Sequence, residues 1–359
     1  MNIKIIGGGI AGLASALAVA NAGGKATIFE KSASFEPVGA GLQLGPNAAR
    51  ALQSLGAWDA VKPYTYAPPE LHIRDGRNGK IIKRLALGKP FEVRYAMPYR
   101  TAHRSDLHRA LLEVASSKSN IEIQTNVEVD DLLISTFDGI IAADGVWSKS
   151  RQNMFPDTAA IITKDTYYRN LISLPLSFGN VELGCVNLWL YSGGHVVHYP
   201  VGVPAKLNLV AITNGQDPRV FFKDAHADLQ SLLALGKTYT KWPSAYVPFL
   251  QHWQKGNITL IGDAAHGTLP YLAQGAAMAL EDAANLQSEI GKSGNFAQAT
   301  RSFEQNRIAR TTRLHIETQR ARKAYHLGKI FSLGRNLFMR ISNDNGIYTR
   351  LDWIYRSSN

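Results

Sequence analysis

Cysteine is almost absent from this chain of 359 residues, which contains a single one, Cys185. One cysteine cannot build a disulfide framework within the chain, and it cannot supply a cysteine-rich metal site. We therefore expect no metal centre and a reducing, cytoplasmic setting.

Long apolar runs are absent too. None approaches the roughly 18 to 20 consecutive apolar residues that a membrane-spanning helix needs. The first residues lead directly into a short apolar stretch and a glycine-rich turn, so we expect no signal peptide and no stable membrane association. Apolar residues make up 45% of the chain and charged residues 19%, which is ordinary for a soluble globular enzyme.

The sequence lacks the basic–aromatic pattern of a nucleic-acid-binding module, although its formal net charge is +11. Residues 301–359 hold twelve Lys and Arg residues against four Asp and Glu residues, so +8 of the +11 lies in this segment. Its charges are spread among apolar residues in a helical pattern. We expect a solvated basic helical face and no nucleic-acid partner, and attraction of an anionic substrate or a phosphorylated cofactor stays open. Leu337 and Phe338, with residues 352–355, should pack back on the protein as a helical cap.

The most informative stretch lies near the N-terminus, where an apolar run meets Gly7-x-Gly9-x-x-Gly12 and a helical pattern follows. Gly7 allows a tight turn, Gly9 lets the backbone approach a pyrophosphate, and Gly12 brings the helix close to the strand. The N–H groups at the start of the helix can bind phosphate. A second apolar run ends at Glu30, whose carboxylate can accept hydrogen bonds from a ribose diol. This pattern indicates a dinucleotide site, and by itself it leaves NAD and FAD open.

Two later segments decide between these cofactors. Residues 139–143 read as a buried strand that ends at Asp144-Gly145, and residues 257–261 read as another that ends at Gly262-Asp263. Acidic residues at the carboxyl ends of such strands lie where open α/β sheets bind ligands. A helix rich in small residues then opens at Gly275, and its N-terminus could stabilise negative charge on a reduced flavin ring. One long cofactor that reaches from Gly7 to Gly275 fits FAD.

Residues 160–255 have a different pattern of short, aromatic-rich alternating runs. Residues 186–191 and 195–200, separated by Gly193-Gly194, predict a hairpin in a mostly antiparallel sheet. On such a strand His195 and Tyr199 share one face, and His198 points to the other. From the residues alone, a structural role for His195 and Tyr199 and a catalytic one both stay open.

These patterns predict an α/β fold: a Rossmann-like FAD-binding domain with an inserted, mostly antiparallel β-sheet substrate domain and a C-terminal helical segment. The expected FAD-binding domain comprises 1–70, 100–155 and 255–300. The substrate domain comprises 71–99 and 156–254, and the helical segment comprises 301–359. Gly39, Gly41 and Gly45 predict backbone that is packed tightly against another group.

The three motifs in this order resemble the fingerprints of class A flavoprotein monooxygenases, the single-chain aromatic hydroxylases similar to salicylate and 3-hydroxybenzoate hydroxylases. The similarity covers most of the chain. It implies a set of residues that bind FAD: Gly7, Gly9, Ala11, Gly12, Glu30, Lys31, Gln43, Arg104, Val127, Asp144, Gly145, Asp263, Gly275 and Ala276.

The resemblance also implies an activity. Reduced flavin would react with O₂ to give a C4a-hydroperoxide that hydroxylates a small aromatic substrate, either a phenolic acid or an N-heteroaromatic compound. NADH or NADPH would bind transiently as the reductant, because the sequence has no second glycine-rich dinucleotide motif. His195 and Tyr199 match a pair that helps to deprotonate the phenol, and Pro270, Tyr271 and Gln274 would lie near the substrate.

Other interpretations stay open at this point. A flavin dehydrogenase or oxidase would keep every FAD motif. A monooxygenase with a quinone-type or other substrate would keep them too, as would a flavin-binding protein without activity. A homodimer is also compatible with the sequence.

Overall fold

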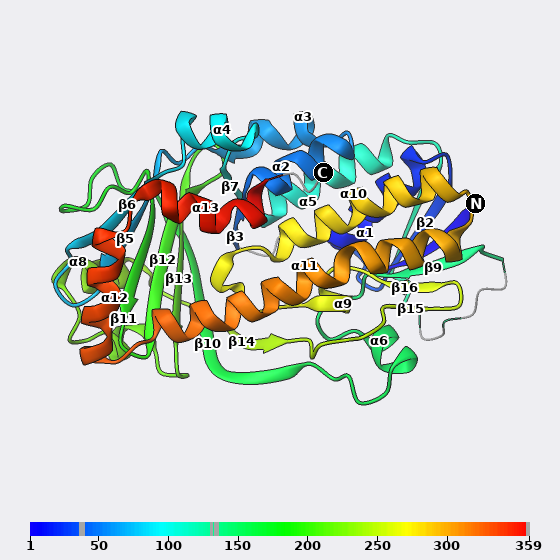
Figure 1. The fold of residues 1–359 in the computed structure, drawn as a ribbon. Helices are drawn as coiled ribbons and strands as arrows, with labels where there is room; N and C mark the ends of the chain where they lie inside the picture. Colours follow the sequence, from blue (N-terminus) through cyan, green and yellow to red (C-terminus); the bar gives the residue numbers. More distant parts are fainter. Residues whose placement is uncertain (36–39, 130–131, 133–135, 357–359) are drawn as a thin grey trace.

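The computed structural model describes residues 1–35, 40–129, 132 and 136–356. It has an α/β fold in which a six-stranded sheet lies at one end of an elongated molecule and a seven-stranded sheet at the other (Figure 1). A small three-stranded sheet and the long helix α11 (Phe296–Tyr325) connect the two ends (Figure 1). No helix among the described residues has both the length and the apolar character needed to cross a bilayer.

The six-stranded sheet has the order β15-β16-β9-β1-β2-β8, and every neighbouring pair is parallel except β15 with β16. Helix α1 packs on this sheet, and α5 and α10 flank α1. The central parallel strands β1, β2 and β9 contribute Ile5, Ile28 and Ile141 to the buried core that the helices cover. The bounds are β1 Asn2–Ile6, β2 Lys25–Glu30, β8 Ile121–Thr125, β9 Gly139–Ala142, β15 Gln254–Lys255, β16 Ile258–Leu260, α1 Ile10–Asn21, α5 Arg104–Ser116 and α10 Gly275–Ser293.

The seven-stranded sheet has the order β14-β10-β13-β12-β11-β5-β6 and is antiparallel except where β11 meets β5. The predicted hairpin is confirmed as β11 and β12, with Leu190 opposite His195. One face of this sheet packs on α8 through an apolar cluster that includes Trp189, Val196 and Leu229. The bounds are β5 Glu70–Asp75, β6 Ile81–Ala86, β10 Ile161–Ser173, β11 Val186–Tyr191, β12 Gly194–Val201, β13 Lys206–Thr213, β14 Thr240–Tyr246, α7 Pro218–Phe221 and α8 Ala227–Leu235.

The three-stranded sheet, in the order β3-β7-β4, lies between the two larger ones. A Cβ atom on Gly41 would lie 2.5 Å from Cγ of Asn208, and one on Gly45 would lie 2.5 Å from the Tyr355 ring. The tight packing expected at these glycines is therefore confirmed, and Gly39 lies outside the described residues. The remaining bounds are β3 Gly41–Leu44, β4 Thr65–Tyr66, β7 Arg100–His103, α2 Pro46–Ser54, α3 Trp58–Val61, α4 Lys89–Tyr95, α6 Lys149–Met154, α9 Asp263–His266, and the short 3₁₀ helices η1 Lys62–Tyr64 and η2 Pro270–Leu272.

The C-terminal segment is helical, as expected, and comprises α11, α12 (Lys329–Ile341) and α13 (Asp344–Tyr355). Ile354 and Tyr355 at the end of α13 are buried against the aromatic cluster around Phe91. The expectation that Leu337 and Phe338 also pack inwards is wrong, because their side chains are 60% and 49% exposed. Helix α12 is held through its polar face instead.

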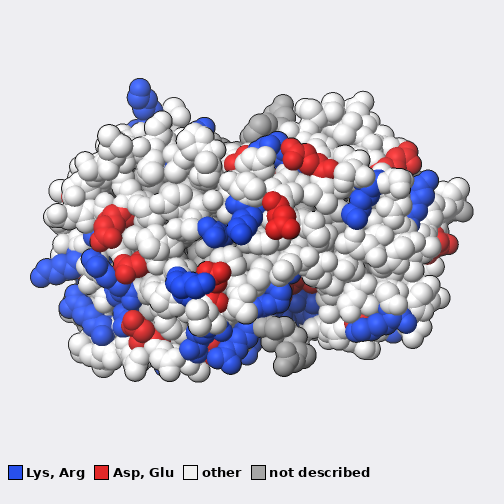
Figure 2. All heavy atoms as spheres, turned by 90° about the horizontal axis from the view of Figure 1, so that it is seen from above, with Lys and Arg blue, Asp and Glu red and all other residues white. Residues whose placement is uncertain are grey.

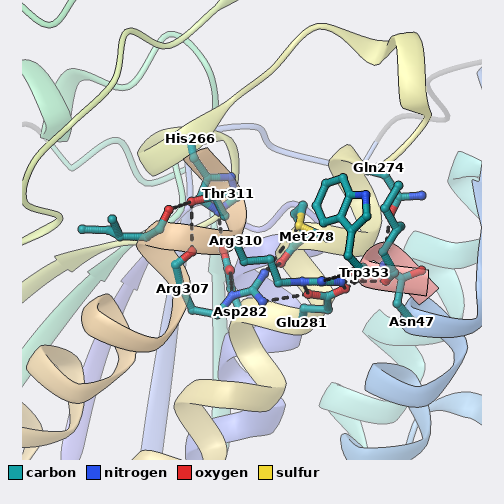
Figure 3. A network of polar contacts seen from close by, with 12 residues as sticks. Asn47, His266, Gln274, Met278, Glu281, Asp282, Arg307, Arg310, Thr311 and Trp353 are labelled. Carbon is teal, nitrogen blue, oxygen red and sulfur yellow. Dashed lines mark hydrogen bonds and ion pairs between the residues drawn. The ribbon is translucent and has the colours of Figure 1, made fainter. Parts of the chain in front are cut away.

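The basic residues of α11 are not all solvated, in contrast to the sequence-based expectation. Arg307 is buried and forms ion pairs of 2.7 Å with both Glu281 and Asp282 on α10 (Figure 3). Arg310 binds Glu281 as well, at 2.6 Å. On the face seen from above, basic side chains are interspersed with acidic ones (Figure 2).

Asp282 lies at the centre of this network. Its side chain is fully buried and accepts hydrogen bonds from the backbone N–H of Gly262, at 3.0 Å, and from Nε2 of His266, at 2.6 Å. Burial raises the pKa of Asp282, but His266 and Arg307 outweigh this effect and hold the pKa below its usual value. The charged carboxylate therefore joins α10, α11 and the loop after β16 in one arrangement.

Glu281, the neighbour of Asp282, extends the network towards the three-stranded sheet. It accepts a 2.6 Å hydrogen bond from Nδ2 of Asn47 on α2. Arg310, which binds Glu281, also donates to the backbone carbonyls of Trp353 and Ile354 on α13 (Figure 3). Two adjacent acids on α10 thus tie five segments together.

Replacing Arg307 by methionine should destabilise the protein by about 3–5 kcal/mol, because it leaves a buried carboxylate without its cation. The change can be measured as a lower urea midpoint. Arg320→Met is the matched control: Arg320 lies on the same helix and pairs with Glu317, but its side chain is 70% exposed. The control should lose less than about 1 kcal/mol. Equal losses in the two variants would contradict the structural role given to the buried network.

Candidate active site

The glycine turn after β1 is closed on the protein side and open on the other. Gly7 has φ +99°, and a Cβ atom there would lie 2.7 Å from the carbonyl oxygen of Ala143. A Cβ atom on Gly12 would lie 1.9 Å from the carbonyl oxygen of Gly7. At Gly9, by contrast, a Cβ atom would meet nothing within 4 Å. Two glycines are thus required by packing, and the third faces empty space at the start of α1.

Glu30 ends β2 next to this turn. Its carboxylate accepts hydrogen bonds from the backbone N–H groups of Gly8, at 2.7 Å, and Ser32, at 2.9 Å. Burial raises the pKa of Glu30, but these backbone donors outweigh it and hold the pKa below its usual value. Lys31 is exposed, and the N–H of Val127 donates to the carbonyl of Glu30. Glu30 therefore remains ionised beside the open side of the turn.

A cavity of about 780 Å³ adjoins the turn, and Gly8, Gly9, Glu30 and Arg104 are among the residues that line it. Arg104 is the first residue of α5, and its backbone N–H donates to the carbonyl of Ala40. His108, one turn further along α5, bonds the carbonyl of Gly8 at 2.7 Å. Sequence reasoning missed His108, although its place one turn after Arg104 was a usable signal.

Asp144 and Gly145 follow β9, next to the turn at Gly7. The Asp144 carboxylate accepts hydrogen bonds from the hydroxyl of Ser148, at 2.6 Å, and from the backbone N–H of Ser150, at 3.0 Å. In this structure Asp144 therefore holds the start of α6.

Arg151 is a further residue that sequence reasoning missed. It is fully buried and donates to the carbonyls of Val146, at 2.8 Å, and Ala264, at 3.0 Å. It thereby fixes the loop after β9 against the loop after β16, and both loops border the expected cofactor site.

Asp263 begins α9 after Gly262, which has φ +58° and packs against Ala11 of α1. The Asp263 side chain is open to solvent, yet desolvation by the surrounding protein raises its pKa. A Cβ atom on Gly275, the first residue of α10, would lie 4.0 Å from this carboxylate. Ala276 follows, so the N-terminus of α10 opens beside Asp263.

These features fit a long dinucleotide cofactor. The N-terminus of α1 has no side-chain cap, so its N–H groups are available to phosphate. The N-terminus of α10 has no side-chain cap either. A Cβ atom on Gly262 would meet Ala11 of α1 at 2.9 Å and Ala279 of α10 at 3.3 Å, so the two helices approach each other beside Asp263. FAD has the length and the chemistry for both ends.

The face of the seven-stranded sheet that is not covered by α8 carries the predicted substrate residues. We call this surface the substrate face, after that prediction. His195 and Tyr199 are both buried and lie on this face of β12, while His198 lies on the face of Trp189. The expected alternation is confirmed. The two residues are about 13 Å apart along the strand, so they can contact opposite ends of one small ring.

His195 belongs to a polar cluster that sequence reasoning missed. Its Nδ1 lies 3.0 Å from Nε2 of His326, and its ring packs on Tyr271 with 5.2 Å between centroids. The Tyr271 hydroxyl donates to Asp165 at 2.6 Å, and Arg322 also binds Asp165. Burial, and secondarily His326, keep the pKa of His195 well below its usual value, so the imidazole is neutral.

Tyr199 lies at the other end of this face. Burial raises its pKa to about 12, so it is a neutral phenol that can donate a hydrogen bond. Gln43 interacts with Tyr199 and accepts a hydrogen bond from the Tyr99 hydroxyl. The structure thus places Gln43, predicted as a cofactor residue, on β3 with its side chain against Tyr99 and Tyr199.

Arg169 on β10 is another residue that sequence reasoning missed. It is half-buried near Tyr199 and Tyr167, and burial lowers its pKa. Its Nε is buried and has no hydrogen-bond partner among the described residues. A cation in this position is suited to bind an anionic group on a ligand.

Gln274 and Pro270 lie on either side of Tyr271. The Gln274 side chain is buried and accepts a 2.9 Å hydrogen bond from Nδ2 of Asn47, which joins it to the network of Glu281 (Figure 3). Pro270 begins η2 and is exposed. Gln274 is thus joined through Asn47 to the buried charges of α10.

Two glycine substitutions should separate folding from cofactor binding. Gly12→Ala should prevent the turn from closing and lower the thermal midpoint of the apoprotein, because its Cβ overlaps the Gly7 carbonyl. Gly9→Ala should leave that midpoint nearly unchanged but weaken FAD binding at least tenfold, since its methyl group enters the space of the pyrophosphate. Thermal unfolding and flavin titration measure the two effects. Full FAD affinity in Gly9→Ala would contradict this placement of the cofactor.

Comparisons with known proteins agree with the geometry. The model of a family described as an FAD binding domain matches residues 224–315. The 3-hydroxybenzoate 6-hydroxylase of Polaromonas naphthalenivorans is 30% identical over 98% of this chain and 95% of its own. The 6-hydroxynicotinate 3-monooxygenase of Bordetella bronchiseptica is 30% identical over 87% of this chain and 89% of its own.

A solved structure shares the whole fold. Klebsiella pneumoniae HpxO, in complex with FAD and uric acid, superposes with a TM-score of 0.87 and 20% identity over 98% of this chain and 95% of its own. The identity and coverage of the two hydroxylases above establish the family. This chain belongs to the FAD-dependent aromatic hydroxylases, which are single-chain flavoprotein monooxygenases.

Proposed function

We propose that this enzyme hydroxylates a small aromatic acid that carries a phenolic hydroxyl group, with NAD(P)H and O₂ as co-substrates. In the balanced reaction one oxygen atom enters the ring and the other leaves as water, while NAD(P)H is oxidised. The names of the relatives support this substrate class, since 3-hydroxybenzoate and 6-hydroxynicotinate both carry a ring hydroxyl and a carboxylate.

The observation that carries the proposal is the composition of the substrate face. It combines a neutral imidazole, His195, with a half-buried cation, Arg169, which lies over the Trp242 ring and whose Nε has no hydrogen-bond partner among the described residues. Tyr167, Tyr199 and Tyr271 supply apolar ring surface around them. A phenol at one end of a ring and a carboxylate at the other match these two groups.

His195 would receive the phenol proton. Its pKa is well below the usual value, so the imidazole does not retain the proton and serves as a relay. His326, 3.0 Å away and only half-buried, is the next acceptor, and it leads towards solvent. Tyr199 would orient the substrate by donating a hydrogen bond, since its high pKa keeps it protonated.

The cofactor would lie along the site from Glu30 to Gly275. Arg104 and the N-terminus of α1 would bind its phosphates, and Asp263 would bind the polyol. When bound, FAD supplies the redox chemistry that activates O₂, and the protein supplies orientation and a dry pocket. The N-terminus of α10 would favour negative charge on the ring system.

A panel of hydroxylated benzoates and pyridinecarboxylates should include compounds that stimulate NAD(P)H oxidation and yield hydroxylated product. Arg169→Met should raise KM for an accepted acid about 10- to 100-fold, by loss of a charge-assisted hydrogen bond, and leave flavin content unchanged. For a neutral analogue with CH₂OH in place of the carboxylate, the same substitution should change KM little. Arg84→Met, on the same sheet but 55% exposed, is the control.

Two outcomes would contradict this assignment. Peroxide formation without product for every acid would indicate an oxidase. An Arg169→Met enzyme with unchanged KM would place the carboxylate elsewhere.

His195→Gln should slow hydroxylation about 10²- to 10⁴-fold and affect flavin reduction less, since only hydroxylation needs a proton acceptor. In the unchanged enzyme the imidazole is neutral above its depressed pKa, so kcat should not fall as the pH drops from about 7.5 to about 6. Stopped-flow rates across this range test both points. Equal slowing of both steps would remove the proposed role of His195, and a titration near the ordinary histidine pKa that disappears in the variant would contradict its low pKa.

A further inference from the structure

Helix α12 is attached to the protein through its polar face. Ser332 and Asn336 are buried, and Asn336 donates a 2.8 Å hydrogen bond to Asp75 at the end of β5. Arg335 donates to the backbone carbonyls of Ala324 and Tyr325 at the end of α11. These hydrogen bonds, together with partly buried Met339, which packs against the apolar cluster of Ile82 and Leu190, fix this side of the helix.

The opposite face of α12 is apolar and exposed. Its residues recur at helical spacing, and we call this surface the α12 face. It consists of Ile330 (80% exposed), Phe331 (73%), Leu333 (69%), Leu337 (60%), Phe338 (49%) and Ile341 (74%).

This orientation is the reverse of the usual one. A surface helix of a globular protein turns its apolar stripe to the core and its polar residues to water. Six large apolar side chains in contact with water on one 13-residue helix are a contiguous patch, and patches of this kind mark interaction sites.

We propose that the α12 face is the contact surface for a second copy of this chain, which packs its own α12 antiparallel against it around a two-fold axis. The six side chains present on the order of 700 Å² of surface, close to the ~800 Å² per partner of a standard-sized interface. A two-fold contact uses the same patch on both copies, so a single apolar face is sufficient.

Gly334 indicates that the partner packed on the α12 face is a helix. It lies near the middle of α12 and is exposed, and a Cβ atom there would meet nothing within 4 Å. In an antiparallel pair the centres of the two helices cross, and the absence of a side chain at this point allows the backbones to approach closely. A lipid surface would gain nothing from a glycine at the centre of the apolar face.

The ends of α12 allow the same arrangement. Asp344, which follows the helix, is 54% exposed but is already paired with Lys83 at 2.5 Å, so its charge is not required for the contact between copies. Antiparallel packing aligns the dipoles of the two helices favourably. The exposed basic residues of the helix, Lys329 and Arg340, are fewer than the roughly four to eight typical of a segment that binds anionic lipid.

Pairing would also affect the substrate face. Tyr325 and His326 end α11 just before α12 and pack on His195, with ring centroids 5.3 and 5.2 Å away. Arg335 of α12 holds the same end of α11. A contact that fixes α12 would therefore also fix the group that receives the proton from His195.

Light scattering after size-exclusion chromatography of the FAD-loaded enzyme tests the proposal. Wild type should elute with the mass of two chains, and Leu337→Glu and Ile341→Glu should elute as single chains, with dimer dissociation constants raised at least about 100-fold. These positions are exposed, so thermal unfolding of the variants should show an intact fold. Val93→Glu on α4, where Val93 is 72% exposed, is the matched control and should remain dimeric.

A cysteine at the centre of the face gives a second test. Gly334→Cys should form a disulfide-linked dimer under mild oxidation, while the native Cys185 is buried and should not. A monomeric wild type would overturn the proposal, as would dimers that survive both glutamate substitutions. Flotation of a monomer with phosphatidylglycerol vesicles, but not with phosphatidylcholine vesicles, would assign the face to a membrane instead.

Discussion

The ion pairs between Arg307 and the acids Glu281 and Asp282 are the contact on which the rest of the structure depends. Each carboxylate is held by several donors, and those donors come from segments that are far apart in the chain. Buried ion pairs contribute little net stability compared with apolar packing of the same volume. Their effect here is geometric, because charged groups without partners would be costly and the donors must therefore stay in place.

Under the proposed function, that network positions the residues that would bind the cofactor and the substrate. Asp282 holds the N–H of Gly262, the residue before Asp263, and Glu281 holds Asn47, which in turn binds Gln274 beside the start of α10. Asp263 and Gln274, which we propose to lie at the flavin and the substrate, are thereby held in place by the same two acids. An enzyme that transfers an oxygen atom from flavin to a ring needs this mutual positioning, since orientation is what the protein adds to the chemistry of the cofactor.

On the substrate face, burial is the largest cause of the pKa shifts of His195 and Tyr199. His195 is neutral because desolvation and a neighbouring imidazole disfavour its charged form, and Tyr199 is protonated because desolvation disfavours the phenolate. Arg169 stays half-buried beside them. The same face thus offers a proton acceptor, a hydrogen-bond donor and a cation, which are the groups that the proposed substrate requires.

The amino-acid sequence by itself determined the features that depend on local backbone geometry and periodicity. Gly7 and Gly12 sit where no side chain fits, alternation predicted the hairpin of β12, and the small residues after Gly275 marked α10. The glycine turn and the two acidic strand ends also pointed to FAD.

Only the tertiary structure decided the pairing of His195 with His326, the environment of Arg169 and the burial of Arg307. It also decided the outward direction of Leu337 and Phe338. These features depend on contacts between residues that are far apart in the chain, or on which face of a helix finds a partner. Neither leaves a periodic signal in the sequence, because periodicity reports only how neighbouring residues share a helix or strand face.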